Sequence, residues 1–305
     1  MLQLTFQFCF PGSVAEEESR APLTSSTCDA AVEVFSLQSA VTSVFQLPVV
    51  SHKVQGDHAS LELLYIPGSL LEKHVLRSKE TDDPDIRDSS VISAIRSGCD
   101  IVPGILEGGF TVWDGSKELI TAVLFNLSHS VFRHKTVLEL GCGCGLPGLA
   151  AMKLGAKRVT FQDYNRDVLT HWTIPNAKLN LAACESAVPH LDFVSGDWLR
   201  LAEHWESSRT HKYDIILTAE TIYRPDLYHR LLRVIKATLD PCGSVFMMCK
   251  GSYGSGGNFM DFLDIVNAED SFHVDVEPLV LNAMVKYFVK IRWKYTQSSI
   301  LYPSI

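Results

Sequence analysis

The chain has 305 residues, of which 46% are hydrophobic, and a formal net charge of −8. This length and composition suit one sizeable α/β domain with an appendage. No apolar run is long enough to span a bilayer, and no Lys/Arg run supplies the basic face that gripping a nucleic-acid backbone requires. We therefore expect neither membrane insertion nor direct nucleic-acid binding, and the acidic balance favours a basic protein as partner.

The cysteines and histidines give no sign of a metal site. The eight cysteines are scattered without a C-x-x-C pair, so neither zinc nor a disulfide framework is expected. Such cysteine usage fits a reduced intracellular compartment. The apolar N-terminus lacks a basic stretch, so a signal peptide is not expected either.

The chain divides into two parts at about residue 90. Residues 1–55 lack clear periodicity, residues 60–66 suit a strand, and the charged stretch 79–88 suits a surface turn. We expect 1–90 to be a flexible, poorly ordered and divergent N-terminal extension, and 91–305 to be the functional domain.

From residue 101 the pattern becomes regular. Glu107-Gly108-Gly109 predicts a hairpin turn, and Trp113 precedes a helix whose apolar residues recur at helical spacing. Strands are expected at 136–140, 158–163, 191–195, 213–218 and 244–250, helices at 146–154, within 166–183, at 225–239 and at 258–266, and an antiparallel closing pair at 273–279 and 285–295. This alternation predicts a doubly wound, mostly parallel sheet of seven strands.

A glycine-rich loop follows the first strand of this series. Residues 136–145 read Thr-Val-Leu-Glu-Leu-Gly-Cys-Gly-Cys-Gly, a buried strand that leads into three glycines spaced two apart. Glycines tolerate unusual φ values and let a ligand approach the backbone, and the next helix points its free N–H groups at the loop. A nucleotide-like cofactor fits this arrangement.

Two interpretations of the loop compete. Gly143, Gly145 and Gly148 satisfy the dinucleotide pattern G-x-G-x-x-G, with Asp163 at a suitable distance to bind a ribose. The alternative is the acid-x-G-x-G-x-G loop of methyltransferases that use S-adenosylmethionine (SAM), with Glu139 as the leading acid. The Glu139 carboxylate would repel a pyrophosphate and attract the SAM ammonium and sulfonium, which favours the second interpretation.

Polar residues also follow the next three strands. They are Asp163 and Tyr164, then Gly196-Asp197-Trp198, then Ala219-Glu220-Thr221-Ile222-Tyr223. Asp163 suits the ribose hydroxyls, and Asp197 with Trp198 suits the adenine, although either acid alone is equally typical of a helix cap or turn. Open α/β sheets bind ligands at the carboxyl ends of their strands, so these residues are expected to share one site.

Together these blocks resemble the histidine protein methyltransferase family, within the seven-strand (class I) SAM-dependent methyltransferases. The resemblance runs from about residue 100 to the C-terminus. Its most specific pieces are Phe161-Gln-Asp-Tyr-Asn165 and Glu220-Thr-Ile-Tyr223. Members methylate an imidazole nitrogen of the large-subunit ribosomal protein uL3, so the resemblance implies that partner, a monomer, and a location in cytoplasm and nucleus.

The resemblance also implies the residues that bind SAM. They are Trp113, Asp114, Gly115, Ser116, Lys117, Glu139, Gly141, Gly143, Gln162, Asp163, Tyr164, Gly196, Asp197, Trp198 and Ala219. Cys144 stands where relatives often have serine and Ala219 where some have it, so a hydroxyl contact is absent at these positions.

Methyl transfer depends mainly on aligning the nucleophile with the methyl group. A histidine is mostly neutral at pH 7, whereas a lysine must lose a proton at a cost of about 4.6 kcal/mol. A histidine methyltransferase thus needs a group that accepts the imidazole proton, for which Glu220 and Tyr223 are the candidates. A structural role for Glu220 and a channel-wall role for Tyr223 are the alternatives. Lysine methylation and a non-catalytic SAM-binding assembly factor are the competing functions.

Overall fold

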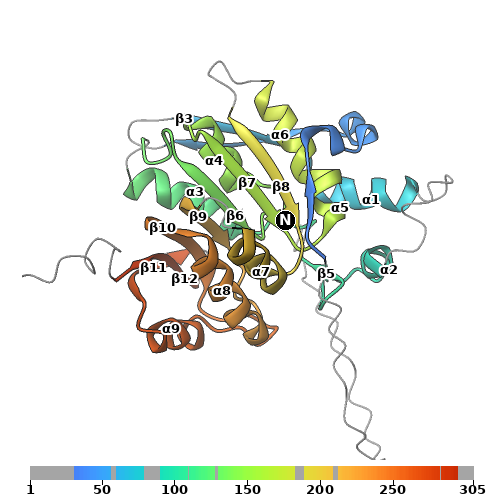
Figure 1. Ribbon diagram of the computed structural model, residues 1–305. Coiled ribbons are helices and arrows are strands. Elements are labelled where there is room, and N and C mark those ends of the chain that lie inside the picture. The colour runs from blue at the N-terminus through green and yellow to red at the C-terminus, as the bar shows by residue number, and fades with distance from the viewer. Residues whose placement is uncertain are drawn as a thin grey trace, which may run out of the picture.

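The computed structural model describes residues 31–55, 60–78, 90–108, 110–127, 130–182, 189–208, 212–281 and 283–294. The surface turn predicted at 79–88 lies outside these residues. The described residues form one large mixed sheet with helices on both faces (Figure 1).

All seven predicted strands of the large sheet are present. They are β6 (Thr136–Leu140), β7 (Arg158–Asp163), β8 (His190–Ser195), β9 (Tyr213–Ala219), β10 (Leu239–Lys250), β11 (Phe272–Leu281) and β12 (Met284–Trp293). The order is β1-β8-β7-β6-β9-β10-β12-β11, in which β8, β7, β6, β9 and β10 are parallel and β12 and β11 close the sheet antiparallel. An eighth strand, β1 (Glu33–Phe35), pairs antiparallel with β8 at the other edge.

Helices cover both faces of the sheet. The described α-helices are α1 (Gly68–Ser78), α2 (Ser90–Arg96), α3 (Asp114–Asn126), α4 (Leu146–Lys153), α5 (Arg166–Val168), α6 (Ile174–Leu181), α7 (Trp198–Ser208), α8 (Tyr228–Thr238) and α9 (Phe259–Ala268). A π-helical turn, η3 (Leu169–Thr173), joins α5 to α6, and 3-10 turns lie at Leu37–Ser39, Thr42–Gln46 and Pro225–Leu227.

Two hydrophobic clusters hold these layers to the sheet. Side chains of a strand alternate between faces, so along β10 Phe246 and Met248 enter the cluster with α3 and α4, whereas Val245 and Met247 enter the cluster with α7, α8 and α9. Lys250 follows Phe246 and Met248 in this alternation, so its side chain lies on the face of the sheet that α3 covers. This placement matters for the site described below.

Residues 31–55 and 60–78 differ from the flexible extension expected there. The hairpin of β2 (Val50–Gln55) and β3 (Ser60–Tyr65) packs against the domain, where Leu63 is fully buried. The Trp172 indole donates to the carbonyl of Ile66 at 2.7 Å, and the backbone N–H of Ile66 donates to Asn176 Oδ1 at 3.0 Å. The strand predicted at 60–66 is present as β3. The packing of this segment against the domain was not predicted, because its partners Trp172 and Asn176 lie more than a hundred residues away in the chain.

Two further elements differ from expectation. The hairpin of β4 (Ile101–Val102) and β5 (Leu106–Glu107) turns at residues 103–105, before the predicted position, because Pro103-Gly104 allows a tight turn and Gly104 has φ 74°. Helix α7 was not predicted, although its buried Leu201, Ala202 and Trp205 recur at helical spacing.

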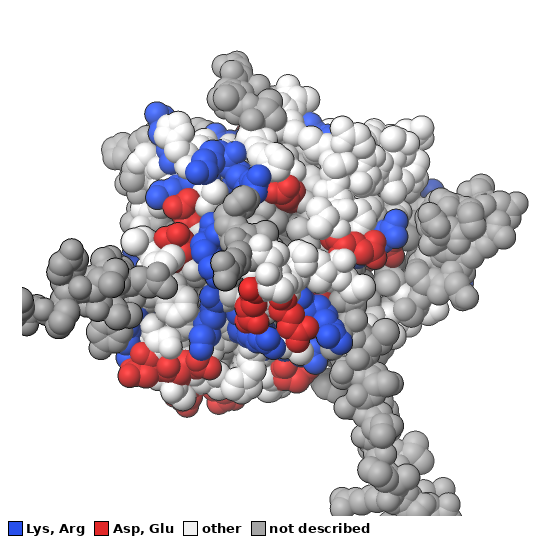
Figure 2. Space-filling model, in the orientation of Figure 1, with Lys and Arg blue, Asp and Glu red and all other residues white. Residues whose placement is uncertain are grey.

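Charges of both signs alternate over α7 and α8 on the face that Figure 2 shows. Arg200 pairs with Glu203 at 3.2 Å, and Arg233 pairs with Glu206 at 3.0 Å. Among the described residues, no helix is long and apolar enough to cross a membrane.

Candidate active site

A cavity of about 670 Å³ opens at the carboxyl ends of the parallel strands, where open α/β sheets bind ligands. Its wall combines the glycine loop, the ends of β7, β8, β9 and β10, the β4–β5 hairpin and the loop after β10. Ten of the predicted cofactor-binding residues line it: Trp113, Ser116, Gly141, Gly143, Asp163, Tyr164, Gly196, Asp197, Trp198 and Ala219. Both predicted catalytic residues, Glu220 and Tyr223, also line it.

The glycine loop is built from left-handed residues. Gly141, Gly143 and Gly145 have φ values of 64°, 51° and 81°, which only glycine adopts at little cost. A Cβ at Gly141 would lie 2.8 Å from the Thr221 methyl group, so a side chain there would displace the segment after β9. The loop therefore exposes bare backbone to the cavity.

Glu139 supports this loop from behind. Its carboxylate is buried and accepts the backbone N–H of Gly148 at 2.7 Å, in the first turn of α4. Burial raises the pKa of Glu139 well above its usual range, and this hydrogen bond offsets part of the effect. Glu139 does not line the cavity, so in this structure it fixes the loop to the helix.

Gln162 connects three segments in the half of the cavity that contains Gly141, Asp163 and Trp198, here called the cofactor half. Its Oε1 accepts the Trp198 indole N–H at 2.8 Å and the backbone N–H of Gly141 at 3.3 Å. Its Nε2 donates to the carbonyl of Gly196 at 3.0 Å. Gln162 thus positions the loops after β6 and β8 without lining the cavity itself.

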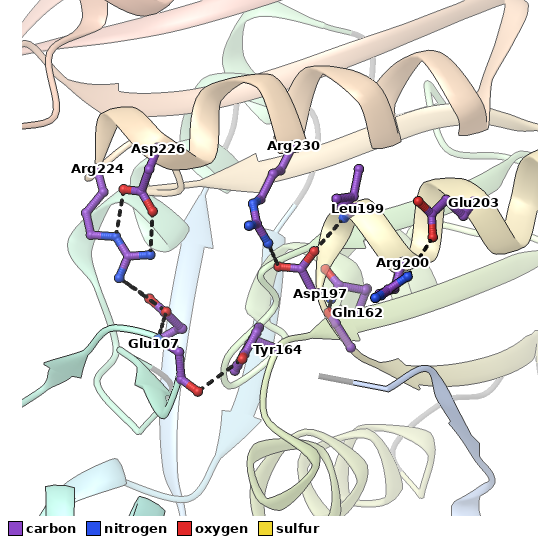
Figure 3. A network of polar contacts seen from close by, with 12 residues as sticks. Glu107, Gln162, Tyr164, Asp197, Leu199, Arg200, Glu203, Arg224, Asp226 and Arg230 are labelled. Atoms are coloured by element: carbon purple, nitrogen blue, oxygen red, sulfur yellow. Dashed lines mark hydrogen bonds and ion pairs between the residues drawn. The ribbon is translucent and has the colours of Figure 1, made fainter. Parts of the chain in front are cut away.

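Asp163 faces the cavity with its backbone partners already in place. Its carboxylate accepts the backbone N–H of Gly143 at 2.9 Å and that of Asn165 at 3.0 Å. Burial raises its pKa to about 6, although both hydrogen bonds favour the ionised form. The neighbouring Tyr164 donates its hydroxyl to the carbonyl of Gly104 at 3.0 Å (Figure 3).

Asp197 combines a helix cap with an ion pair. Its Oδ1 accepts the backbone N–H of Leu199 at 2.8 Å at the start of α7, and Arg230 of α8 donates to its Oδ2 at 2.6 Å (Figure 3). The cap that the sequence left open as an alternative is therefore present, beside the indole of Trp198.

The start of α3 forms the opposite wall. Trp113 precedes the helix and donates its indole N–H to the carbonyl of Gly108 at 3.0 Å. Asp114, Gly115 and Lys117 do not line the cavity, and the Lys117 ammonium lies 5.9 Å from the ring centroid of Tyr65.

Gly115 packs against Glu220 and leaves room for nothing larger. A Cβ at Gly115 would lie 2.5 Å from Glu220 Oε1. The N-terminal turn of α3 and the segment after β9 therefore meet at the Glu220 carboxylate.

Glu220 is held in an unusual state. Its φ is 60°, a strained value for a residue with a Cβ, and its backbone N–H donates to the carbonyl of Met248 at 2.9 Å. Neither carboxylate oxygen has a hydrogen-bond partner of normal geometry among the described residues, although Lys250 Nζ lies 4.0 Å away. Burial raises the pKa of Glu220, and the charge of Lys250 and the hydroxyl of the nearby Tyr253 oppose that rise.

Tyr223 and Glu107 line the cavity and are joined by a hydrogen bond. The Tyr223 hydroxyl donates to the Glu107 carboxylate, which also accepts the backbone N–H of Gly104 at 2.7 Å and pairs with Arg224 at 3.3 Å. Burial and the nearby Glu107 charge raise the pKa of Tyr223 well above its usual range, so this phenol stays protonated. Figure 3 shows Glu107 paired with Arg224 beside the Asp197–Arg230 pair.

Several cavity residues had no predicted role. Glu107 belongs to the predicted turn at 107–109, but its pairing with Tyr223 and Arg224 arises only in the fold. Lys250 ends the fifth strand and lines the cavity, a position that the strand-end rule applied to the other strands would have selected. Among the described residues, no group of three or more His, Cys, Asp and Glu side chains is arranged to hold a metal.

A family model described as "Lysine methyltransferase" matches residues 105–265, more than half of the chain. The chain belongs to this methyltransferase family. The match includes β5, the glycine loop and the strand ends that form the cavity.

Curated relatives carry both histidine and lysine in their names. The chain is 32% identical to the histidine protein methyltransferase 1 homolog of Bos taurus, over 67% of this chain and 60% of that protein. The homolog of Dictyostelium discoideum is 35% identical over 55% of this chain and 51% of its own length. The protein N-lysine methyltransferase METTL21A of Mus musculus is 27% identical over 54% of this chain and 72% of its own length. The chain thus spans between half and two thirds of the histidine methyltransferase homologs.

These findings confirm the predicted resemblance, the methyltransferase fold class and SAM as the cofactor of the family. The cavity fits that cofactor. Bare glycine backbone, a carboxylate and an indole line one half, at Gly141, Gly143, Asp163 and Trp198.

Proposed function

We propose that this chain transfers the methyl group of SAM to an imidazole nitrogen of a histidine in a protein. The observation that carries the proposal is the Glu220 carboxylate, which lines the cavity and has no hydrogen-bond donor of normal geometry among the described residues. A buried acceptor that is left unsatisfied is costly, so a ligand that donates a hydrogen bond there is favoured. A neutral imidazole has one N–H to donate.

Bound SAM supplies an electrophilic methyl group. One imidazole nitrogen forms a bond to the methyl carbon as the carbon–sulfur bond breaks, and the N–H proton on the other nitrogen passes to Glu220. Glu220 also fixes the tautomer, because it accepts the N–H before attack. Tyr223 stays protonated beside Glu107. Together with Glu220 it lines the half of the cavity that receives the methyl acceptor, here called the acceptor half.

The resemblance of the motif blocks supports uL3 as the substrate, methylated in the cytoplasm or nucleus by a monomeric enzyme. A basic ribosomal protein also suits an acidic chain. Lysine methylation is the second candidate, because the family model and one relative carry lysine in their names. A non-catalytic assembly factor is a third reading, which the intact carboxylates of the cavity oppose.

The decisive experiment incubates the full chain with methyl-labelled SAM and recombinant uL3, followed by acid hydrolysis and mass spectrometry. We expect methylhistidine in uL3, and a lower level of it in uL3 from cells that lack this gene. Methyllysine in its place would establish the second candidate. SAM binding without any methylated product, from uL3 or from whole ribosomal extract, would favour the third.

A further inference from the structure

Lys250 brings a positive charge to the acceptor half of the cavity. Its Nζ lies 4.0 Å from Glu220 Oε2, and its side chain is 22% exposed whereas that of Glu220 is 3% exposed. The ammonium also lies 5.4 Å from the ring centroid of Trp113 and 5.7 Å from that of Tyr253, within the range of cation–π attraction. These contacts hold the charge at the cavity wall.

A second lysine behind it has its own partner. Lys286 of β12 lies directly opposite Lys250 in the sheet and is fully buried. Its Nζ is 2.6 Å from both carboxylate oxygens of Glu118 on α3. Like charges on facing positions destabilise a sheet unless each is compensated. Glu118 therefore compensates Lys286, and Glu220 is left to compensate Lys250.

The pairing of Lys250 with Glu220 affects a neutral and a cationic methyl acceptor differently. Because Lys250 already balances Glu220, a neutral imidazole enters without adding charge. A lysine ammonium would add a second cation beside Lys250, and at about 6 Å in surroundings of effective dielectric ~20 the repulsion amounts to roughly a hundredfold in binding. Without Lys250, the unpaired Glu220 carboxylate would attract an ammonium instead.

We propose that Lys250 is a specificity-determining residue, which excludes cationic acceptors such as lysine and admits the neutral imidazole of histidine. This inference rests on the proposed function and deepens it. It assigns the choice between the two amino acids to a residue on β10, outside the motif blocks that indicated the family.

The test compares two forms of recombinant uL3. One has the unmodified histidine that serves as methyl acceptor, and the other has lysine at that position. With labelled SAM, we expect the full-length wild-type chain to prefer the histidine form strongly. Lys250→Gln should raise the lysine-to-histidine rate ratio by roughly tenfold to a hundredfold, because one unit charge is removed. Lys250→Arg keeps the charge and should keep the preference. Calorimetric SAM affinity and thermal unfolding show that each variant is folded.

A competition assay with the wild-type chain needs no variant. uL3 with lysine at the acceptor position should compete with the histidine form at least tenfold less well than uL3 with the uncharged methionine there. Equal competition, or an unchanged rate ratio in folded Lys250→Gln, would overturn the role of Lys250 and leave the proposed function standing. Methyllysine as the wild-type product would overturn both.

Discussion

The two halves of the cavity treat their carboxylates differently. In the cofactor half, Asp163 accepts two backbone N–H groups and Asp197 accepts a backbone N–H and an arginine. In the acceptor half, Glu220 is equally buried but meets Lys250 only at 4.0 Å and has no hydrogen bond of normal geometry among the described residues.

The difference follows from what each half must do. Carboxylates that are saturated by backbone donors fix the shape of a loop, so the cofactor half is already formed before ligand binding. A buried carboxylate without a hydrogen-bond donor of normal geometry is unfavourable until such a partner arrives. The strained φ of Glu220 adds to this, since such strain persists where the surrounding structure enforces it. The acceptor half is therefore completed by its substrate.

The largest expected effect comes from Glu220→Gln. The amide keeps the size of the side chain but cannot take the imidazole proton, so the rate of methyl transfer should fall by about 10² to 10⁴. The affinity for S-adenosylhomocysteine, measured by calorimetry, should not change, because Glu220 lies in the other half. Glu206→Gln, on the exposed face of α7 away from the cavity, is the control and should retain activity. Full activity of Glu220→Gln would mean that Glu220 has a structural role.

Asp163→Asn should act on the other half. The amide cannot accept from both Gly143 and Asn165 and no longer offers a charged acceptor to the ribose. Hydrogen bonds to charged groups contribute about 1.5–3 kcal/mol, so the affinity for S-adenosylhomocysteine should fall roughly tenfold to a hundredfold. Asp192→Asn, a partly exposed acid on β8 away from the cavity, is the matched control and should bind normally. Equal affinity in both variants would contradict the ribose role.

The pH dependence of cofactor binding sharpens the same point. The pKa of Asp163 is raised to about 6, so the affinity for S-adenosylhomocysteine should fall by up to about tenfold per pH unit below that value. The stability of the unliganded protein should respond in the opposite direction. Between the ordinary value of 3.8 and about 6 the folded state binds more protons than the unfolded state, so the Asp163 contribution increases as the pH falls. Titration calorimetry and urea unfolding at several pH values measure the two trends, and both should vanish in Asp163→Asn.

Local patterns predicted much of the fold because the central strands are short buried apolar runs bounded by glycine, proline and acids. The strands β6 to β10 and the closing pair were found in this way. Strand β1 was not found, because three residues with two exposed side chains are a strand only when β8 lies beside them. Helix α7 was missed because its first residue, Trp198, was assigned to the loop motif.

The site divides in the same manner. The glycine loop and Asp163 follow two successive parallel strands, so the sequence placed them at the cavity. Lys250, Glu107 and Arg224 gain their roles from partners far along the chain. Glu107, for example, meets Tyr223 and Arg224 more than a hundred residues away. Such pairings depend on the order of the strands, which no local pattern specifies.

The smallest expected effect concerns this Glu107 cluster, which joins the β4–β5 hairpin to the acceptor half. Glu107 and Arg224 are only 10% and 13% exposed, so Glu107→Gln should remove a partly buried ion pair while the amide keeps a hydrogen bond to Tyr223. We expect the free energy of unfolding to fall by about 1–3 kcal/mol. Amide exchange should accelerate at 101–107, because the hairpin loses its link to the end of β9.

Glu203→Gln is the comparison for this prediction. It removes an exposed ion pair on α7 and should change stability by less than about 1 kcal/mol. The two variants could have the same free energy of unfolding, with amide exchange at 101–107 unchanged. In that case Tyr223 and the hairpin backbone hold the cavity wall in place without the negative charge of Glu107. If Glu107→Gln alone accelerates exchange, the acceptor half owes its closed wall to an ion pair, in contrast to the backbone bonds that shape the cofactor half.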